Sequence, residues 1–462
     1  MNSKKDVFLE EKFPKMGESM YQLMEKLFPI CRSITGNGVR DTLKIIKNFV
    51  NIKIFEIPSG AEVFDWTIPK EWNINDAYVI DPNGEKIIDF KKSNLHVVSY
   101  SLPIDRKVSL MELKEHLHTI PEKPDVIPYV TSYYSKEWGF CITHNQFLNL
   151  KEGEYHVVID SKLDNGSLTY GEYIIPGKNK EEILLTCYVC HPSMCNDNLS
   201  GIVLLTFLAK YLNDFQLNYS IRFLFVPETI GAITWIHKNE QNLSKIKHGL
   251  VATCLGDPGK FTYKKSRNGD NEIDKIVTNI LEKSSKDYKI TEFFPWGSDE
   301  RQFCSPAFDL PIGSLMRSMY GTNDFPEYHT SADNLSFVNE ESLGESFKMY
   351  LKIIFELDKN FPKSNENFLK KEKKKVVNSE FYENLNPKCE PQLIKKQIHR
   401  KFGGQKNSFD ERKEEQAMFW VLNLSDGNNS IADIVQKSGL DENMIRDAID
   451  ILVNSDLLKK IS

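Results

Sequence analysis

Short apolar runs alternate with amphipathic stretches through the middle of the chain. The runs predict three core strands, at Ile183–Val189, Ser220–Val226 and Gly249–Leu255. The stretches predict helices over Leu199–Leu212, from Ile230 onward and over Asp274–Lys283. Apolar strands separated by helices indicate an α/β fold with a mostly parallel, mixed sheet and helices on both faces.

Two other patterns precede this core. Ser19–Pro29 and the stretch from Gly38 to about Val50 carry apolar residues at helical spacing, which predicts two opening helices. From Ile52 to about Lys162, short β-rich runs are separated by turn signals such as Asp81-Pro82-Asn83-Gly84. This part predicts a β-rich lobe whose loop aromatics serve in packing.

The C-terminal part follows a predicted helix over Glu341–Asp358. The next stretch, Phe361–Gln405, includes the charged run 370–375 and is interpreted as a linker at least in its first part, because such runs are usually solvated. Three helices and a strand are then predicted at Glu411–Leu424, Ser430–Ser438, Glu442–Asn454 and Leu457–Ile461. Their order is typical of a winged-helix domain.

These patterns divide the chain into four parts. Residues 1–55 and 163–360 are assigned to an α/β domain, 56–162 to an inserted β-rich lobe, 361–409 to a linker region and 410–462 to a winged-helix-like domain. A length of 462 residues suits two to four domains, and a hydrophobic content of 40% is enough to build their cores.

Charge and cysteine content narrow the function classes. The net charge of -6 gives no broad positive field for nucleic acid or an anionic membrane. Residues 411–462 carry ten acidic and six basic side chains, a net of -4, which predicts a protein partner or a homodimer through this domain rather than DNA. Without an apolar leader or span, and with eight sparse cysteines, we expect a cytoplasmic protein with reduced thiols.

The segment from Cys187 to Gly201 carries the first candidate chemistry. An apolar strand ends there, His191 and Asp197 follow in a polar loop, and a helix begins at Leu199. Ligands of parallel sheets bind beyond the carboxyl ends of the strands, and imidazole and carboxylate are donors that Zn²⁺ favours. The alternative is that Asp197 or Asn198 caps the helix that follows. The cysteines of this segment have no second pair at matching spacing, so packing is favoured over ligation for them.

Three further segments place suitable groups near the same predicted edge. Glu228 and Asp257 each follow a predicted core strand, and His329 lies in the segment EYHTSAD. Taken singly, each residue also fits an ordinary turn or cap. In chain order, however, His, Asp, Glu, Asp and His supply a metal site and a base.

Together, the segments CHPSMCNDNLSG, PETIG, GSDERQF and EYHTSAD resemble the zinc aminopeptidases and carboxypeptidases of the M28 type. The resemblance covers roughly Met16 to Asp358 and runs through a branch of aminopeptidase-like proteins that often accompany polysaccharide biosynthesis. It implies a phosphorylase/hydrolase-like zinc peptidase core, a peptide or amide substrate, and zinc as the cofactor.

The resemblance also implies roles for individual residues. The implied zinc ligands are His191, Asp197, Asp257 and His329, with Asp197 lying between two ions. Glu228 corresponds to the general base. Asp299 and Glu300 lie where members of the family contact substrate and suit an α-ammonium group, whereas Arg301 and Arg317 suit a carboxylate. Ion pairing among these four is the alternative.

Thr229 departs from the family pattern, in which a second glutamate at this position is a zinc ligand. Because a hydroxyl is a poor ligand for Zn²⁺, one zinc ion is the favoured interpretation and two ions are the alternative. The sequence therefore predicts a zinc-dependent hydrolase of peptide or amide bonds. The competing hypotheses are an amidohydrolase acting on an aminoacylated or acylated saccharide in surface-polysaccharide synthesis and a zinc-binding scaffold that has lost catalysis.

Overall fold

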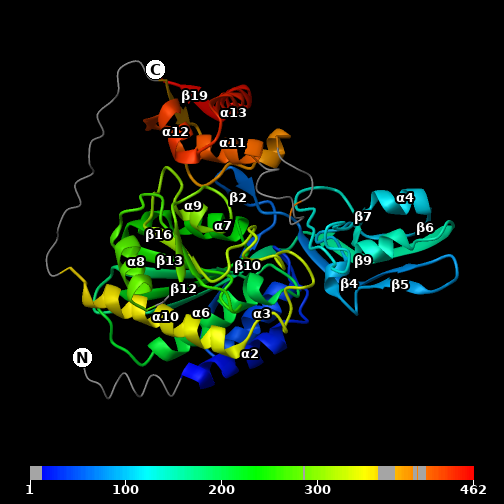
Figure 1. Cartoon of the computed structure of the whole chain (residues 1–462), viewed down its shortest axis with the longest axis horizontal. Coiled ribbons are helices and arrows are strands. Elements are labelled where there is room, and N and C mark those ends of the chain that lie inside the picture. The colour runs from blue at the N-terminus through cyan, green and yellow to red at the C-terminus, as the bar shows by residue number, and fades with distance from the viewer. Residues whose placement is uncertain (1–12, 285–286, 363–379, 399–402, 404–412, 462) are drawn as a thin grey trace.

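An eight-stranded mixed sheet forms the centre of the molecule (Figure 1). The computed structural model describes residues 13–284, 287–362, 380–398, 403 and 413–461. In sheet order, the strands are β1 (Lys53–Pro58), β10 (Ser167–Ile175), β12 (Ser220–Val226), β11 (Glu182–Tyr188), β13 (Ile246–Ala252), β16 (Ile312–Met316), β14 (Phe261–Lys264) and β15 (Tyr288–Thr291). The four middle strands β12, β11, β13 and β16 run parallel to one another, which confirms the predicted fold class.

Helices cover both faces of this sheet. On one face lie α2 (Phe13–Leu27), α3 (Asn37–Lys47), α6 (Ser200–Leu212), α8 (Glu272–Ser284) and α10 (Glu340–Lys359). On the other lie α7 (Ile230–Asn239), α9 (Glu300–Phe303) and the turn η3 (Glu240–Lys245). Neighbouring residues of β11 divide between the two cores, since Leu185 packs with the first group and Leu184 with the second. Side chains of a strand alternate between faces, so a strand covered on both sides is apolar throughout.

The strand β13 ends three residues earlier than predicted. The apolar run continues to Leu255, but the strand ends at Ala252 and the chain then turns. Residues buried in a turn carry the same apolar signal as residues buried in a strand, so the sequence does not mark this end. As a result, Asp257 lies five positions beyond the strand rather than two.

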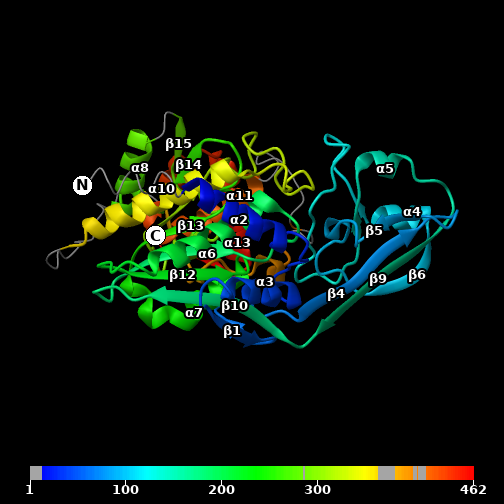
Figure 2. The same ribbon diagram turned by 90° about the horizontal axis from the view of Figure 1, so that it is seen from below.

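The β-rich part forms a lobe beside the β1–β10 edge of the central sheet, as Figure 2 shows. Its antiparallel sheet has the order β5 (Lys86–Asp89), β4 (Glu71–Ile80), β9 (Glu154–Asp164), β6 (Ile104–Ser109). The smaller elements of the lobe and its base are β2 (Glu62–Val63), β3 (Trp66–Thr67), η1 (Asn94–His96), α4 (Leu110–Glu115), β7 (Leu117–His118), β8 (Phe140–Cys141) and α5 (His144–Leu148). The strand β9 leads almost directly into β10, which joins the two sheets.

The C-terminal part contains the three predicted helices, α11 (Lys413–Leu424), α12 (Ile431–Ser438) and α13 (Glu442–Asn454). Its sheet has the order β18 (Asp426–Ser430), β17 (Phe381–Asn384), β19 (Leu458–Lys460). The predicted linker of residues 361–409 was wrong in this respect, since it contains β17 and the turn η4 (Leu393–Lys396). A four-residue strand whose partners lie more than 40 residues away has no local signature. The charged run 370–375 lies outside the described residues.

The C-terminal part packs against the central domain. Arg267, which follows β14, donates a hydrogen bond to Asn423 and pairs with Asp426 at 2.9 Å. Trp296 packs edge-on against Trp420, and both belong to one apolar cluster. These contacts join α11 to the region around α9. Among the described residues, no helix combines the length and hydrophobicity needed to cross a membrane.

Candidate metal centre

His191, Asp197 and His329 converge at the carboxyl end of the central strands. One ligand atom from each lies within 4.8 Å of the others. His191 follows β11, Asp197 lies in the irregular turn η2 (Cys195–Leu199), and His329 lies in the long loop between β16 and α10. Nε2 of His329 is 3.0 Å from Oδ2 of Asp197. Two imidazoles and a carboxylate form a common donor set for catalytic zinc.

The electrostatic state of these groups fits a metal ion. Burial lowers the pKa of His191 to about 4, which keeps the imidazole neutral, the form that binds metals. Burial alone would raise the pKa of Asp197, but the two histidines and a hydrogen bond from Tyr188 lower it overall. Nδ1 of His191 is buried and has no hydrogen-bond partner among the described residues. A neutral imidazole, an anionic carboxylate and an unsatisfied buried nitrogen suit zinc.

Asp197 does not cap the helix that follows it. Its carboxylate instead contacts Tyr188 and His329, while Oδ1 of Asn198 accepts the N–H of Gly201 in the first turn of α6. The capping alternative thus describes Asn198 rather than Asp197.

Two buried ionisable groups that were not predicted from the sequence hold the loop in place. The carboxylate of Asp333 accepts the backbone N–H groups of Asn196 and Asp197, at 2.6 and 2.9 Å. The guanidinium of Arg32 donates to the backbone oxygens of His191 and Pro192, at 2.7 and 2.9 Å. Asp333 lies within the segment EYHTSAD, so its position near His329 was a usable signal. Nothing near Arg32 in the sequence indicates its partners, which are about 160 residues away.

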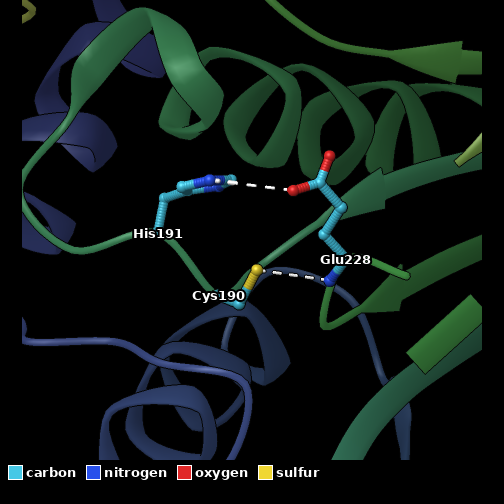
Figure 3. Close-up of side chains that lie close together, drawn as sticks. All are labelled: Cys190, His191 and Glu228. Atoms are coloured by element: carbon cyan, nitrogen blue, oxygen red, sulfur yellow. Dashed lines mark hydrogen bonds and ion pairs between the residues drawn. The ribbon is translucent and has the colours of Figure 1, made fainter. Parts of the chain in front are cut away.

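Glu228 follows β12 and faces the first histidine (Figure 3). Its Oε2 lies 3.8 Å from Nε2 of His191, and its side chain is 26% exposed, so a substrate can reach it. Burial of the group raises its pKa well above the ordinary value; the charges of Asp299 and Asp197 raise it further and that of Arg301 opposes the shift. A carboxylate whose pKa moves toward neutrality is suited to both accept and return a proton.

Cys190 forms a second candidate group with His191 and Glu228. Its Sγ accepts the backbone N–H of Glu228 at 3.2 Å, as Figure 3 shows. Burial raises the pKa of Cys190 well above its ordinary value, which keeps the sulfur a neutral thiol. Because zinc binds the thiolate, the group of His191, Asp197 and His329 is the better metal site. Cys187 and Cys195 are buried in the core cluster.

The structure does not bring Asp257 to this centre. Among the described residues, it is absent from the groups whose ligand atoms lie within 4.8 Å of one another. Its two oxygens accept hydrogen bonds from four donors, namely Asn196 Nδ2, Gly259 N, Ser318 Oγ and Ser318 N. These contacts engage Asp257 in the fold and do not support the predicted ligand role, which stays a prediction.

Asp299 and Arg301 lie next to Glu228 and Thr229. Oδ1 of Asp299 accepts the backbone N–H of Thr229 at 2.7 Å, and burial raises the pKa of Asp299 to about 7. Arg301 donates from Nη2 to Oγ1 of Thr229 at 2.9 Å and pairs with Glu390 at 3.0 Å. Thr229 has a φ of 62°, a rare value for a β-branched residue. Both neighbours therefore hold this threonine in an unfavourable backbone conformation.

Glu300 and Arg317 are engaged in ion pairs of the fold. Glu300 pairs with Lys264, and both side chains are fully buried. Arg317 pairs with Glu345 at 3.0 Å and donates to the backbone oxygen of Gly259. Both residues are thus engaged in the fold, but with Lys264 and Glu345 rather than through the predicted pairing with Asp299 or Arg301. Glu390 was missed because it lies in the segment interpreted as a linker.

Two family models match the chain. The model described as a domain of unknown function, DUF4910, matches residues 21–360. The model described as a winged helix-turn-helix matches residues 380–460, which begins just before β17.

One relative and one solved structure of high identity have names that are more specific than the descriptions of the family models. A Clostridium acetobutylicum protein, provisionally named a polysaccharide biosynthesis protein with an aminopeptidase-like domain, is 55% identical over 96% of this chain and 97% of its own length. A crystal structure of a provisionally named peptidase from Clostridium acetobutylicum has a TM-score of 0.75 and 52% identity, covering 99% of each chain.

More distant structures share the fold alone. A zinc aminopeptidase from Bacillus subtilis has a TM-score of 0.57 and 15% identity, covering 76% of this chain and 96% of its own. A peptidase M28 precursor from Shewanella amazonensis has a TM-score of 0.52 and 13% identity, covering 79% of this chain and 100% of its own.

Proposed function

Because the chain belongs to the DUF4910 family and shares the fold of the M28-type zinc aminopeptidases, we propose that it is a zinc-dependent hydrolase of peptide or amide bonds. The observation that carries this proposal is the convergence of His191, Asp197 and His329 within 4.8 Å, with the carboxylate of Glu228 beside them. These three side chains would hold one zinc ion, and Glu228 would act as the general base.

The donor set and the base divide the chemistry between them. When bound, zinc supplies Lewis acidity, which polarises a carbonyl and makes water a stronger acid. Glu228 accepts the proton of the attacking water and passes it to the leaving nitrogen. Its partly exposed side chain lies at the end of β12, where a substrate amide can approach.

The charged groups near Glu228 suit the orientation of a polar substrate. Asp299 lies close enough to Glu228 to raise its pKa, and its carboxyl group is the candidate partner for an α-ammonium group. Arg301 is held by Thr229 and Glu390, and its positive charge limits the pKa increase of Glu228. A substrate with an amino group near its scissile amide fits this arrangement.

The test begins with metal content in protein purified without chelators or a metal-affinity tag. We expect about one zinc ion per chain by elemental analysis, and its loss in His329→Ala. Glu228→Gln should retain the zinc and lose about 10²–10⁴-fold in turnover of amino-acid amides or p-nitroanilides. Absence of metal after zinc addition, or full activity in Glu228→Gln, would exclude the proposed mechanism.

A second candidate function is hydrolysis of an amide on an acylated saccharide. It is favoured by the name of the Clostridium acetobutylicum relative, which refers to polysaccharide biosynthesis. A parallel panel of N-acyl and aminoacyl sugars distinguishes the two, since turnover should appear on one panel and disappear on chelation. Zinc uptake with no turnover on either panel would favour a zinc-binding scaffold.

A further inference from the structure

Tyr188 contacts the metal centre without being one of its candidate ligands. It is the last residue of β11, and its side chain is buried. Its hydroxyl donates a short hydrogen bond to Oδ1 of Asp197 and makes a second hydrogen bond, of 2.7 Å, with Oγ1 of Thr253. Because the single phenolic proton goes to the carboxylate, Thr253 must be the donor in the second bond. The hydroxyl is therefore held from both sides.

This contact divides the two oxygens of Asp197 between different partners. Oδ1 accepts the hydrogen bond from Tyr188, whereas Oδ2 lies 3.0 Å from Nε2 of His329 and accepts no hydrogen bond of good geometry from the described residues. A carboxylate that bridges two metal ions uses one oxygen for each. Here Oδ1 already accepts the hydrogen bond from Tyr188, so Oδ2 is the less engaged of the two oxygens, which suits coordination of a single ion.

The hydroxyl of Thr229 is also engaged by another side chain of the protein. The hydroxyl of Thr229 accepts a hydrogen bond from Arg301, so a guanidinium occupies the contact that a second cation would need. Thr253 is the first residue beyond β13, and its hydroxyl is hydrogen-bonded to Tyr188. The hydroxyls of Thr229 and Thr253 are thus both engaged by groups of the protein.

We propose that Tyr188 is a positioning residue that fixes Asp197 as a ligand through one oxygen and thereby makes this centre a one-ion site. The inference rests on the proposed zinc-binding function. Hydrogen bonds from such outer partners orient a ligand, and their loss commonly weakens metal binding by about 10–100-fold.

The chain offers a matched control in Tyr129. Its ring packs edge-on against both His191 and His329, with centroids 5.2 Å from each, but its hydroxyl contacts Tyr133 instead of a candidate ligand. Tyr188→Phe and Tyr129→Phe therefore remove the same atom from two buried tyrosines around the same centre. Only the first change alters a contact of Asp197.

The experiment measures zinc stoichiometry and affinity by competition with a chromophoric chelator on the full chain. We expect one ion per wild-type chain at saturating zinc, a loss of affinity of about 10–100-fold in Tyr188→Phe, and a change of less than about threefold in Tyr129→Phe. In cobalt-loaded protein, the visible absorption band should change in Tyr188→Phe alone, because only that variant changes how Asp197 binds.

Several results would overturn the inference while leaving the proposed function intact. These are two ions per wild-type chain, an unchanged affinity in Tyr188→Phe, or equal losses in both tyrosine variants. If Tyr188→Phe does not fold, Thr253→Val removes the second partner of the hydroxyl, and an unchanged zinc affinity there would count against the role of Tyr188. Bound zinc without turnover would instead overturn the function alone.

Discussion

The loops after β11 and β13 each carry a buried aspartate, and only one of the two is available to a metal. Asp197 and Asp257 are 0% and 1% exposed, and both were predicted ligands. Asp257 accepts four hydrogen bonds from its own loop and its neighbours, whereas Oδ2 of Asp197 faces His329. Burial and residue type are therefore the same in both loops, and the number of protein donors around the carboxylate decides its role.

The local backbone explains this difference. In the first loop, the turn η2 begins seven residues after β11, and the N–H groups of Asn196 and Asp197 are bound by Asp333. The carboxylate of Asp197 is thus spared from satisfying its own backbone. In the second loop, Asp257 accepts the N–H of Gly259 two residues onward, which is a turn-stabilising contact.

The largest expected effect separates the two aspartates directly. Asp197→Asn removes the anionic member of the three candidate ligands and should weaken zinc binding by about 10²–10³-fold, since three ligands share the binding free energy. Asp257→Asn should change the affinity by less than about threefold. Chelator competition on both variants is the measurement, and equal losses would contradict the assignment of Asp257 to the fold.

A smaller loss should follow when the anchor of the first loop is changed. Asp333→Asn places an amide N–H against one of the two backbone N–H groups that the carboxylate accepts. We expect Asp197 to lose its orientation, with zinc affinity falling about 10–100-fold while one ion still binds at saturation. The same titration checks this result. An affinity equal to that of the wild type would show that Asp333 only stabilises the fold.

Asp257→Asn should instead reduce stability. The amide N–H cannot replace an acceptor, so at least one of the four donors is left buried without a partner, at a cost of about 1–3 kcal/mol. A lower midpoint of thermal unfolding, measured with chelator in both proteins, would reveal this cost. Added zinc should then raise the midpoints of wild type and Asp257→Asn alike, because it binds only the folded chain.

The smallest expected effect concerns Asp299, a third buried aspartate. Its Oδ1 accepts the backbone N–H of Thr229. Its pKa in the folded protein is raised to about 7 from an ordinary value of 3.8. The unfolded chain releases this proton first, so the contribution to stability falls as pH rises through that interval. Asp299→Asn should remove this loss, gaining on the order of 1 kcal/mol relative to wild type between pH 6 and pH 7. The measurement is the free energy of unfolding of both proteins as a function of pH. A difference between them that stays constant over this pH range would contradict the pKa shift.

Most of the fold could be predicted from the sequence, but the boundaries of β13 and of the C-terminal part could not. The three C-terminal helices were found within two residues of their observed ends, since their apolar spacing is local. The strands β17 and β18 were missed because they are short and depend on partners elsewhere in the chain. The lobe and the α/β core were recognised from the change in hydrophobic pattern.

The same distinction between local patterns and distant contacts applies to the candidate site. The sequence by itself determined the residues that can bind a metal or move a proton at this edge, because the ends of apolar strands and the segments around His191, Glu228 and His329 are local patterns. Only the tertiary structure decided that Asp197 keeps an available oxygen, that Asp257 does not, and that Tyr188 lies against the centre. Hydrogen-bond satisfaction of a buried carboxylate depends on donors from distant parts of the chain, and no local pattern records them.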